Sequence, residues 1–494
     1  MTAASKFKMN GSKCHHGSTR SVAWSAAAPR YLYFTSFIWL ATFGRFSSVL
    51  LEEIGFSATQ LGTVIGLARL ISLVASPALA AAADVIRDPW VIGAVLVALQ
   101  CVCSLLLFAA SAFLPANDGV VGVVRLATCG CVFVCGIVAV GAFFPILDAL
   151  TVEAVGSTAY ADERVWGAVS WGVAHLALGF IADWSGSMRN IALVNPVATA
   201  VFGVFYICFR RAQRVSAALP LPVHPAEYVV AADGADGPAR AEASAASSLR
   251  AEHGEAASAE AAAATEGATA PTRRAPFREL RVVLLSPLVA TFLITCAVLS
   301  GAVSCVTNLL FLFMKDGLGS SNVLCGASVI VTVVFEIPIF VVARRVQRVL
   351  RVRGLVVVAM LAYILRGAGY SLVPRAHPFL ILALEPLHGV TYGCIKIAQV
   401  SFLKAHSPLG WEATMQSLAS AVGGVGSMVG VVVGGFVIER FGAKVLYRGA
   451  AMCVGVGLAA YVGVSQCAAP EKAAEDLAEA EAGLAEEDVE MVPH

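Results

Sequence analysis

Residues 120–145 read VVGVVRLATCGCVFVCGIVAVGAFFP, and this stretch decides the fold class. Its only charged residue is Arg125. A helix needs roughly 20 mostly apolar residues to cross the hydrocarbon core of a bilayer, and the stretch is long enough to do so. It therefore predicts a transmembrane helix.

The rest of the chain has the same character. Its 494 residues are 58% hydrophobic and 14% charged, and the mean hydropathy is +0.78. Soluble domains average roughly 45–50% apolar and about 25% charged residues, so the composition excludes an ordinary soluble enzyme, a disordered chain and a disulfide scaffold. The net charge of +1 predicts no nucleic-acid partner. The lipid bilayer is the expected environment of most of the chain.

Apolar runs of spanning length divide the chain into two sets of six. They are residues 31–51, 58–81, 90–112, 120–145, 166–183, 191–209, 286–313, 322–343, 355–373, 379–403, 413–437 and 445–465. The expected organisation is a basic tail (1–30), a six-helix bundle (31–209), a disordered linker (210–281), a second six-helix bundle (282–465) and an acidic tail (466–494).

The distribution of Lys and Arg predicts the orientation, because cytoplasmic loops carry an excess of both. With the N-terminus inside, the inner segments hold 14 of these residues even without the long linker, against 6 in the outer loops. Both termini and the linker are therefore expected in the cytoplasm. The plasma membrane is preferred, and an organelle membrane is the alternative, because the basic, acid-free residues 1–30 also fit a transit peptide.

Short motifs accompany the expected spans. In the first half they are PALAAAAD ending at Asp84 and followed by Arg87, PILDALT with Asp148, and ERVWGAVSWG with Arg164 and Trp166. In the second half they are EIP from Glu336, RGAG from Arg366, EPLHGVT from Glu385 and ATMQ from Ala413. These motifs resemble those of the major facilitator superfamily, in its lactose-permease-like and nucleoside-proton-symporter-like branch, over about residues 30–465.

The resemblance implies an all-α membrane protein with twelve transmembrane helices in two six-helix pseudo-repeats. Such proteins are secondary transporters, usually driven by a proton gradient, whose halves rock around a central site. Arg366 and His388 stand where lactose permease has an Arg and a His of its proton-coupling group. The carboxylate expected three residues after that His is replaced by Thr391, so Glu385 or Glu336 would have to substitute.

The segment 379–403 carries a polar stripe on an apolar background. The residues of this stripe follow one another at steps of three and four, which places them on one face of a helix. They are Glu385, His388, Tyr392, Lys396 and Gln399. Contact with lipid would be costly, so the stripe should face a water-filled cavity. Glu385 beside His388 fits a proton-handling pair with Arg366 as counter-charge; a neutralised structural network is the alternative.

Other ionisable residues lie within the expected spans. Arg69 is in the middle of 58–81, as either an anion-binding group or a member of a structural ion pair. Glu336 precedes Pro338, which can kink a helix, and fits either a titratable gate or a carboxylate bonded to a neighbouring helix. Arg45 and Arg125 are nearer the outer surface and are expected to extend their charges towards it.

A gate is expected at the inner ends of the first-half spans. Asp148 and Arg164 would form an ion pair that seals the cytoplasmic mouth, with Trp166 beside it and with Asp84 and Arg87 as part of the same inner-face motifs. Capping at the membrane edge is the alternative for Asp148.

With the resemblance, the expected function is a proton-coupled symporter of a small polar solute that works by alternating access as a monomer. Arg69 and Arg366 favour an anionic or zwitterionic substrate. A non-transporting receptor or scaffold of the same fold is the alternative. No enzyme, cofactor or metal site is expected, because the chain has no phosphate-binding G-x-x-x-x-G-K-[ST] motif, no recognisable catalytic motif and no C-x-x-C pair among its 13 Cys.

Overall fold

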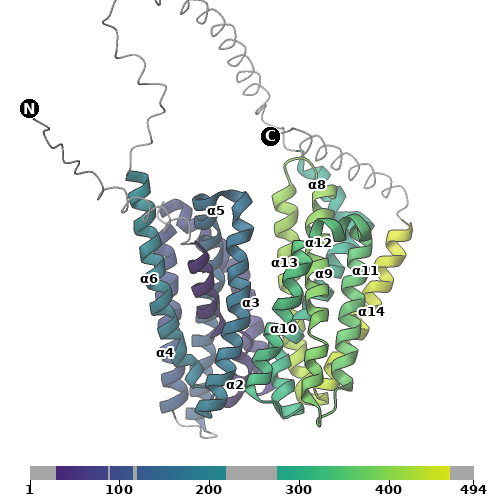
Figure 1. Ribbon diagram of the computed structural model, residues 1–494. Helices are drawn as coiled ribbons and strands as arrows, with labels where there is room; N and C mark the ends of the chain where they lie inside the picture. Colours follow the sequence, from purple (N-terminus) through teal and green to yellow (C-terminus); the bar gives the residue numbers. More distant parts are fainter. Residues whose placement is uncertain (1–28, 87–88, 115–118, 219–274, 468–494) are drawn as a thin grey trace, which may run out of the picture.

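The computed structural model describes residues 29–86, 89–114, 119–218 and 275–467. Within these ranges the chain is helical and has no strand. The helices form two groups that follow the two halves of the sequence, coloured purple to teal and green to yellow in Figure 1. The all-α membrane fold expected from the sequence is confirmed.

The first half begins with a helix over residues 29–41. It continues with α2 (Ser47–Ile54), α3 (Ala58–Ile86), α4 (Pro89–Phe113), α5 (Val120–Ser185) and α6 (Asn190–Ala218). Helix α5 holds two membrane-length segments, because Gly156 breaks it with a φ of 79°. Glycine adopts such a positive φ without the steric cost that a Cβ brings, so the chain can turn back there.

The second half is built in the same way. Its elements are α8 (Phe277–Leu285), α9 (Pro287–Leu312), η2 (Phe313–Gly317), α10 (Asn322–Val341), α11 (Ala343–Leu372), η3 (Pro378–Ala383), α12 (Pro386–His406), α13 (Glu412–Phe441) and α14 (Ala443–Cys467). Serine caps begin two of the spans, since the hydroxyls of Ser286 and Ser321 accept hydrogen bonds from Val289 N and Leu324 N.

Ten segments of the described chain are long and apolar enough to cross a membrane. They match ten of the twelve expected spans. The other two are also largely helical: 31–51 is interrupted by a turn at 42–46, and 355–373 lies in α11, whose start is rich in Arg. The total of twelve stays a prediction.

Helical residues extend into the expected linker from both sides, because α6 continues to Ala218 and α8 begins at Phe277. We call the end of the molecule with these two helix termini, at the top of Figure 1, the linker end, and the opposite end the loop end. The remainder of the expected linker, most of the basic tail and nearly all of the acidic tail lie outside the described residues.

The halves pack through α3 against α13 and through α5 against α10. Glycines allow this approach towards the loop end. A Cβ on Gly62 would lie 2.5 Å from the carbonyl oxygen of Val431, and one on Gly326 would lie 2.8 Å from Leu176 Cα. No side chain fits at either place, so helices of opposite halves meet backbone to backbone.

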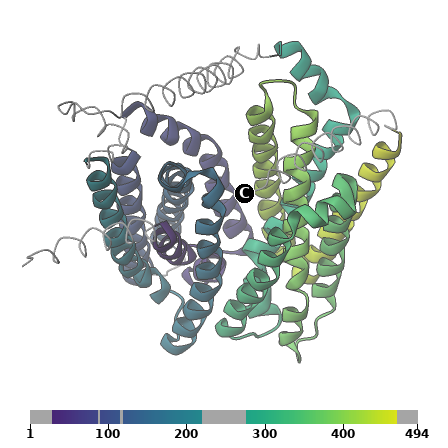
Figure 2. The same cartoon turned by 45° about the horizontal axis from the view of Figure 1, so that its top comes forward.

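Two carboxylates bind the halves together at the loop end. Asp183 in α5 accepts hydrogen bonds from the backbone N–H groups of Asn322 (3.1 Å) and Val323 (2.9 Å) and from the Asn322 amide (2.8 Å). Glu439 in α13 accepts one from Thr59 N–H (2.8 Å). Each carboxylate thereby caps the N-terminus of a helix in the opposite half. These hydrogen bonds between the halves lie at the loop end, and at the linker end the ribbons stand apart (Figure 2).

Candidate functional site

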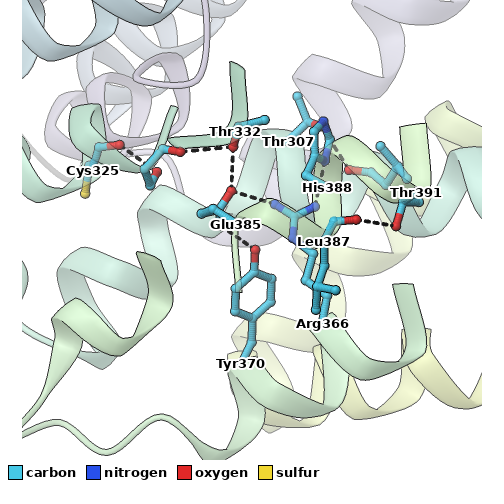
Figure 3. A network of polar contacts seen from close by, with 11 residues as sticks. Thr307, Cys325, Thr332, Arg366, Tyr370, Glu385, Leu387, His388 and Thr391 are labelled. Carbon is cyan, nitrogen blue, oxygen red and sulfur yellow. Dashed lines mark hydrogen bonds and ion pairs between the residues drawn. The ribbon is translucent and has the colours of Figure 1, made fainter. Parts of the chain in front are cut away.

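A buried charge network joins α10, α11 and the start of α12 in the second half (Figure 3). Arg366 of α11 donates from Nη2 to Glu385 Oε2 at 2.8 Å and contacts His388 Nδ1 from Nη1 at 2.7 Å. Tyr370 donates to Glu385 Oε1 at 2.5 Å, and Thr332 of α10 donates to Glu385 Oε2 at 2.7 Å. Arg366 and Glu385 have no exposed surface and pair with each other inside the protein, while Arg366 Nε has no hydrogen-bond partner among the described residues.

The geometry fixes the protonation of His388. A guanidinium has only donors, so Nδ1 of His388 must accept the hydrogen bond from Arg366 and carry no proton. The ring is therefore the neutral tautomer with its hydrogen on Nε2, and it lies parallel to the ring of Tyr392 at 6.0 Å. Arg366 joins Glu385 to His388, in place of the direct contact expected from their spacing.

A cavity of about 340 Å³ lies between the halves and next to this network. Arg69 of α3 is its lining residue from the first half, and α9, α12 and α13 supply the others. Lys396 Nζ is 3.5 Å from Gln399 Oε1 and 5.7 Å from the ring centre of Tyr392. Within the described residues, neither Arg69 nor Lys396 has a carboxylate partner.

The structure divides the polar stripe into two parts. Tyr392, Lys396 and Gln399 line the cavity, whereas Glu385 and His388 are enclosed in the network with Arg366. The division follows from position along the helix, because Glu385 and His388 lie at the start of α12, where both contact Arg366 of α11. The two ends of the stripe therefore lie in different surroundings.

Glu336 and Arg45 belong to opposite halves and their charges act on each other, although the charge of Glu385 acts more strongly on Arg45. Glu336 is half-buried in α10 and forms no hydrogen bond or ion pair with another described residue, and the charge of Arg45 acts on it. Arg45 is only 5% exposed and lies in the break between residues 41 and 47. Its Nε and Nη1 atoms have no partner among the described residues.

The expectation that Arg45 and Arg125 reach the outer surface is wrong. Both are buried, and Arg125 Nη2 donates to the carbonyl oxygen of Ser111 at 3.0 Å. Arg45 is therefore a candidate site residue that sequence reasoning missed. The charge of Arg45 within an apolar run was the one sign in the sequence. No sequence pattern indicated the break in the helix that buries the side chain.

The expected gate residues Asp148 and Arg164 lie together. Arg164 Nη1 is 3.4 Å from Asp148 Oδ2 and 2.8 Å from the hydroxyl of Tyr160, and Tyr33 donates to Asp148 Oδ1 at 2.6 Å. All four residues belong to the first half, so the pair does not join the halves. Trp166 is 43% exposed. Arg87 and the side chain of Asp84 lie outside the described residues.

Comparison with known families gives one match over most of the chain. The family model described as the MFS_1 like family matches residues 29–449. The Xenopus laevis protein "Major facilitator superfamily domain-containing protein 6-like protein B" is 28% identical over 162 residues. The match covers 33% of this chain and 26% of that protein, so it spans about a quarter of the relative's length.

Solved structures with the same fold include transporters. The nucleoside transporter NupG has a TM-score of 0.62 at 13% identity, over 89% of this chain and 98% of its own. A POT family transporter in complex with a thioalcohol-conjugated peptide has a TM-score of 0.58 at 12% identity, over 90% and 96%. A D-xylose-proton symporter has a TM-score of 0.55 at 11% identity, over 90% and 97%. At these identities the similarity shows the fold.

Proposed function

Because the chain belongs to the MFS_1 like family of the major facilitator superfamily, we propose that it is a secondary transporter of a small polar solute that works by alternating access as a proton-coupled symporter. One observation carries the proposal: a polar cavity lies between two halves that carboxylates hydrogen-bond to each other at the loop end. Rocking of the halves would close the linker end and open the loop end around this cavity.

The excess of Lys and Arg supports a cytoplasmic position for the linker end. In this proposal both termini are cytoplasmic, and the structure is the inward-facing state of a monomer in the plasma membrane. The loop end, fastened by Asp183 and Glu439, is then the outer gate. The solved structures of a nucleoside transporter and a D-xylose-proton symporter with this fold support a polar solute and a proton as cargo.

Glu336 is the group we propose for proton coupling. The Glu385 carboxylate already binds Arg366, Tyr370 and Thr332. Glu336 has no hydrogen-bond partner in the described residues, and the charge of Arg45 acts on it. A proton and the guanidinium would compete for the same carboxylate. Because Arg45 belongs to the other half, movement of the halves would decide which of the two neutralises Glu336.

Uptake into proteoliposomes with an imposed pH gradient tests the proposal, with sugars, nucleosides and small organic acids as candidate solutes. The wild type should accumulate one of them only when the gradient is present. Glu336→Gln should lose gradient-driven accumulation and keep solute exchange, since a neutral side chain cannot bind and release the proton.

The matched control is Glu153→Gln, which removes an exposed carboxylate outside the cavity. It should behave as the wild type. Gradient-driven accumulation that persists in Glu336→Gln would refute the coupling role, and a folded wild type without gradient-dependent flux would refute symport. The rival receptor or scaffold predicts that deletion of residues 470–494 abolishes a partner interaction, whereas a transporter keeps its uptake.

A further inference from the structure

The cavity carries two cations whose charge no described residue compensates. Arg69 lines it from α3 in the first half, and Lys396 lines it from α12 in the second. None of the residues that line the cavity is acidic. Arg69 lies in the middle of a membrane-spanning helix, where a charge without a partner is costly, and its side chain is exposed in the cavity. An anion in this space would compensate both charges.

Arg366 shows what a paired cation looks like in the same protein. Its guanidinium is enclosed by Glu385, His388 and the ring of Tyr370 and has no exposed surface. It is therefore not available to a solute. The contrast separates the buried arginine that stabilises the second half from the two cations that face the cavity.

The cavity also offers acceptors for hydroxyl groups. The hydroxyls of Thr307, Ser420 and Ser427 donate to backbone carbonyl oxygens at 3.0, 3.0 and 3.3 Å. Because their protons are used, their remaining lone pairs can accept hydrogen bonds from a solute. These hydroxyls belong to α9 and α13, on the second-half side of the cavity.

We infer that the transported solute is a small hydroxylated organic anion, whose carboxylate or phosphate group binds between Arg69 and Lys396 while its hydroxyl groups donate to the serines and threonine of α9 and α13. The Gln399 amide and the Tyr392 hydroxyl, which also line the cavity, are further donors to the anionic group. A cavity of about 340 Å³ lies near the lower end of the range of roughly 300–1,000 Å³ for small-molecule sites. The inference rests on the proposed function, since it names the class of solute that the transporter carries.

Binding is measured on the purified full-length protein by the ligand-induced shift of its melting temperature. The probes are gluconate, glucose 6-phosphate and inorganic phosphate, with glucose as the neutral counterpart. Gluconate or glucose 6-phosphate should raise the melting temperature, and glucose should not. Inorganic phosphate separates the two parts of the site: a shift equal to that of the organic anions would overturn the role of the hydroxyls.

Arg69→Gln and Lys396→Gln should each weaken binding of the organic anion at least tenfold, because each removes one of the two charges that hold it. Lys404→Gln is the matched control, as it removes an exposed cation from the same helix as Lys396. Arg69→Lys keeps the charge and should retain part of the shift, which separates loss of binding from loss of folding.

Two results would overturn the inference: equal shifts with glucose and gluconate, or anion shifts that survive both Arg69→Gln and Lys396→Gln. Uptake into proteoliposomes tests the proposed function separately. Binding of an anion without its uptake would retain the anion site and refute the transporter. Gradient-driven uptake of neutral solutes alone would support the proposed transport function and refute the inference that the solute is an anion.

Discussion

Replacing Asp183 by Asn should shift the protein away from the state closed at the loop end. The carboxylate accepts three hydrogen bonds from Asn322 and Val323 at 2.8–3.1 Å and thereby caps the N-terminus of α10 from the opposite half. Asn keeps one carbonyl oxygen but turns an amide N–H₂ towards the donors. The variant therefore loses the negative charge and at least one acceptor, and only in the closed state.

The magnitude follows from helix capping. Loss of an N-cap acceptor costs about 1 kcal/mol, within a range of roughly 0.5–2 kcal/mol. The interaction of a negative charge with the helix dipole accounts for about 0.3–1 kcal/mol of this at an exposed site, and Asp183 is exposed. A change of about 1.4 kcal/mol is tenfold in an equilibrium constant, so about 1 kcal/mol should raise the open-to-closed ratio at the loop end about fivefold.

Electron paramagnetic resonance can measure this ratio in nanodiscs. Spin labels on non-canonical amino acids at Gln60 and Lys444 would report the separation of the halves, because both positions are exposed at the loop end, and would leave the 13 native cysteines unlabelled. The long-distance fraction should grow in Asp183→Asn.

Glu53→Gln is the matched control. The Glu53 carboxylate also accepts hydrogen bonds at the loop end, from Ser187 and from Met188 N–H, but within the first half. It should leave the distance distribution unchanged. An unchanged distribution in Asp183→Asn, or an equal change in Glu53→Gln, would refute the reasoning.

Two further variants test charge pairs elsewhere. Arg366→Gln leaves the Glu385 carboxylate buried without its counter-charge and should lower the free energy of unfolding by about 3–5 kcal/mol. The double variant Arg366→Gln with Glu385→Gln should recover part of this loss in thermal unfolding. Strictly additive losses would contradict the pairing. The second variant concerns Glu52. Its pKa is raised to about 8, mainly by burial and also by Asp316 of the opposite half, whereas the charge of Lys315 lowers it. A raised carboxyl pKa means that this contact favours the closed state most below about pH 4.5 and loses that effect as the pH rises through about 8. The labelled loop end should therefore open at higher pH, and Glu52→Gln should abolish this pH dependence.

The sequence predicted the helices well because lipid imposes a simple rule. A span must be apolar over about 20 residues, and ten of the expected segments meet that rule in the structure. Single-sequence patterns located the chemistry less well. The stripe from Glu385 to Gln399 follows α12, but the sequence does not show that its first part contacts Arg366 while the rest lines the cavity. Glu385 is the N-cap residue of α12 with helical φ and ψ, and its carboxylate pairs with Arg366.

Arg45 could not be placed from the sequence at all. Its burial depends on the break over residues 42–46, which interrupts an otherwise apolar run. The chain approaches His175 so closely there that a Cβ on Gly44 would lie 2.7 Å from His175 Nε2. The hydrogen bond from Arg45 N–H to the same nitrogen joins residues 130 positions apart in the sequence. Periodicity describes neighbours within one helix and carries no information on such a pair.

The two caps at the loop end use the same device in opposite directions. Asp183, near the end of α5, caps α10 of the second half, and Glu439, near the end of α13, caps α3 of the first half. A helix N-terminus needs acceptors in every state, and water supplies them when the halves separate. Each cap is therefore weak enough to break during transport. To reverse a closed-to-open ratio of about 99:1, a ligand must favour the open state by about 5.5 kcal/mol. Contacts of about 1 kcal/mol at the gate can be overcome by such a ligand. A deeply buried ion pair such as Arg366 with Glu385 would instead hold the gate closed.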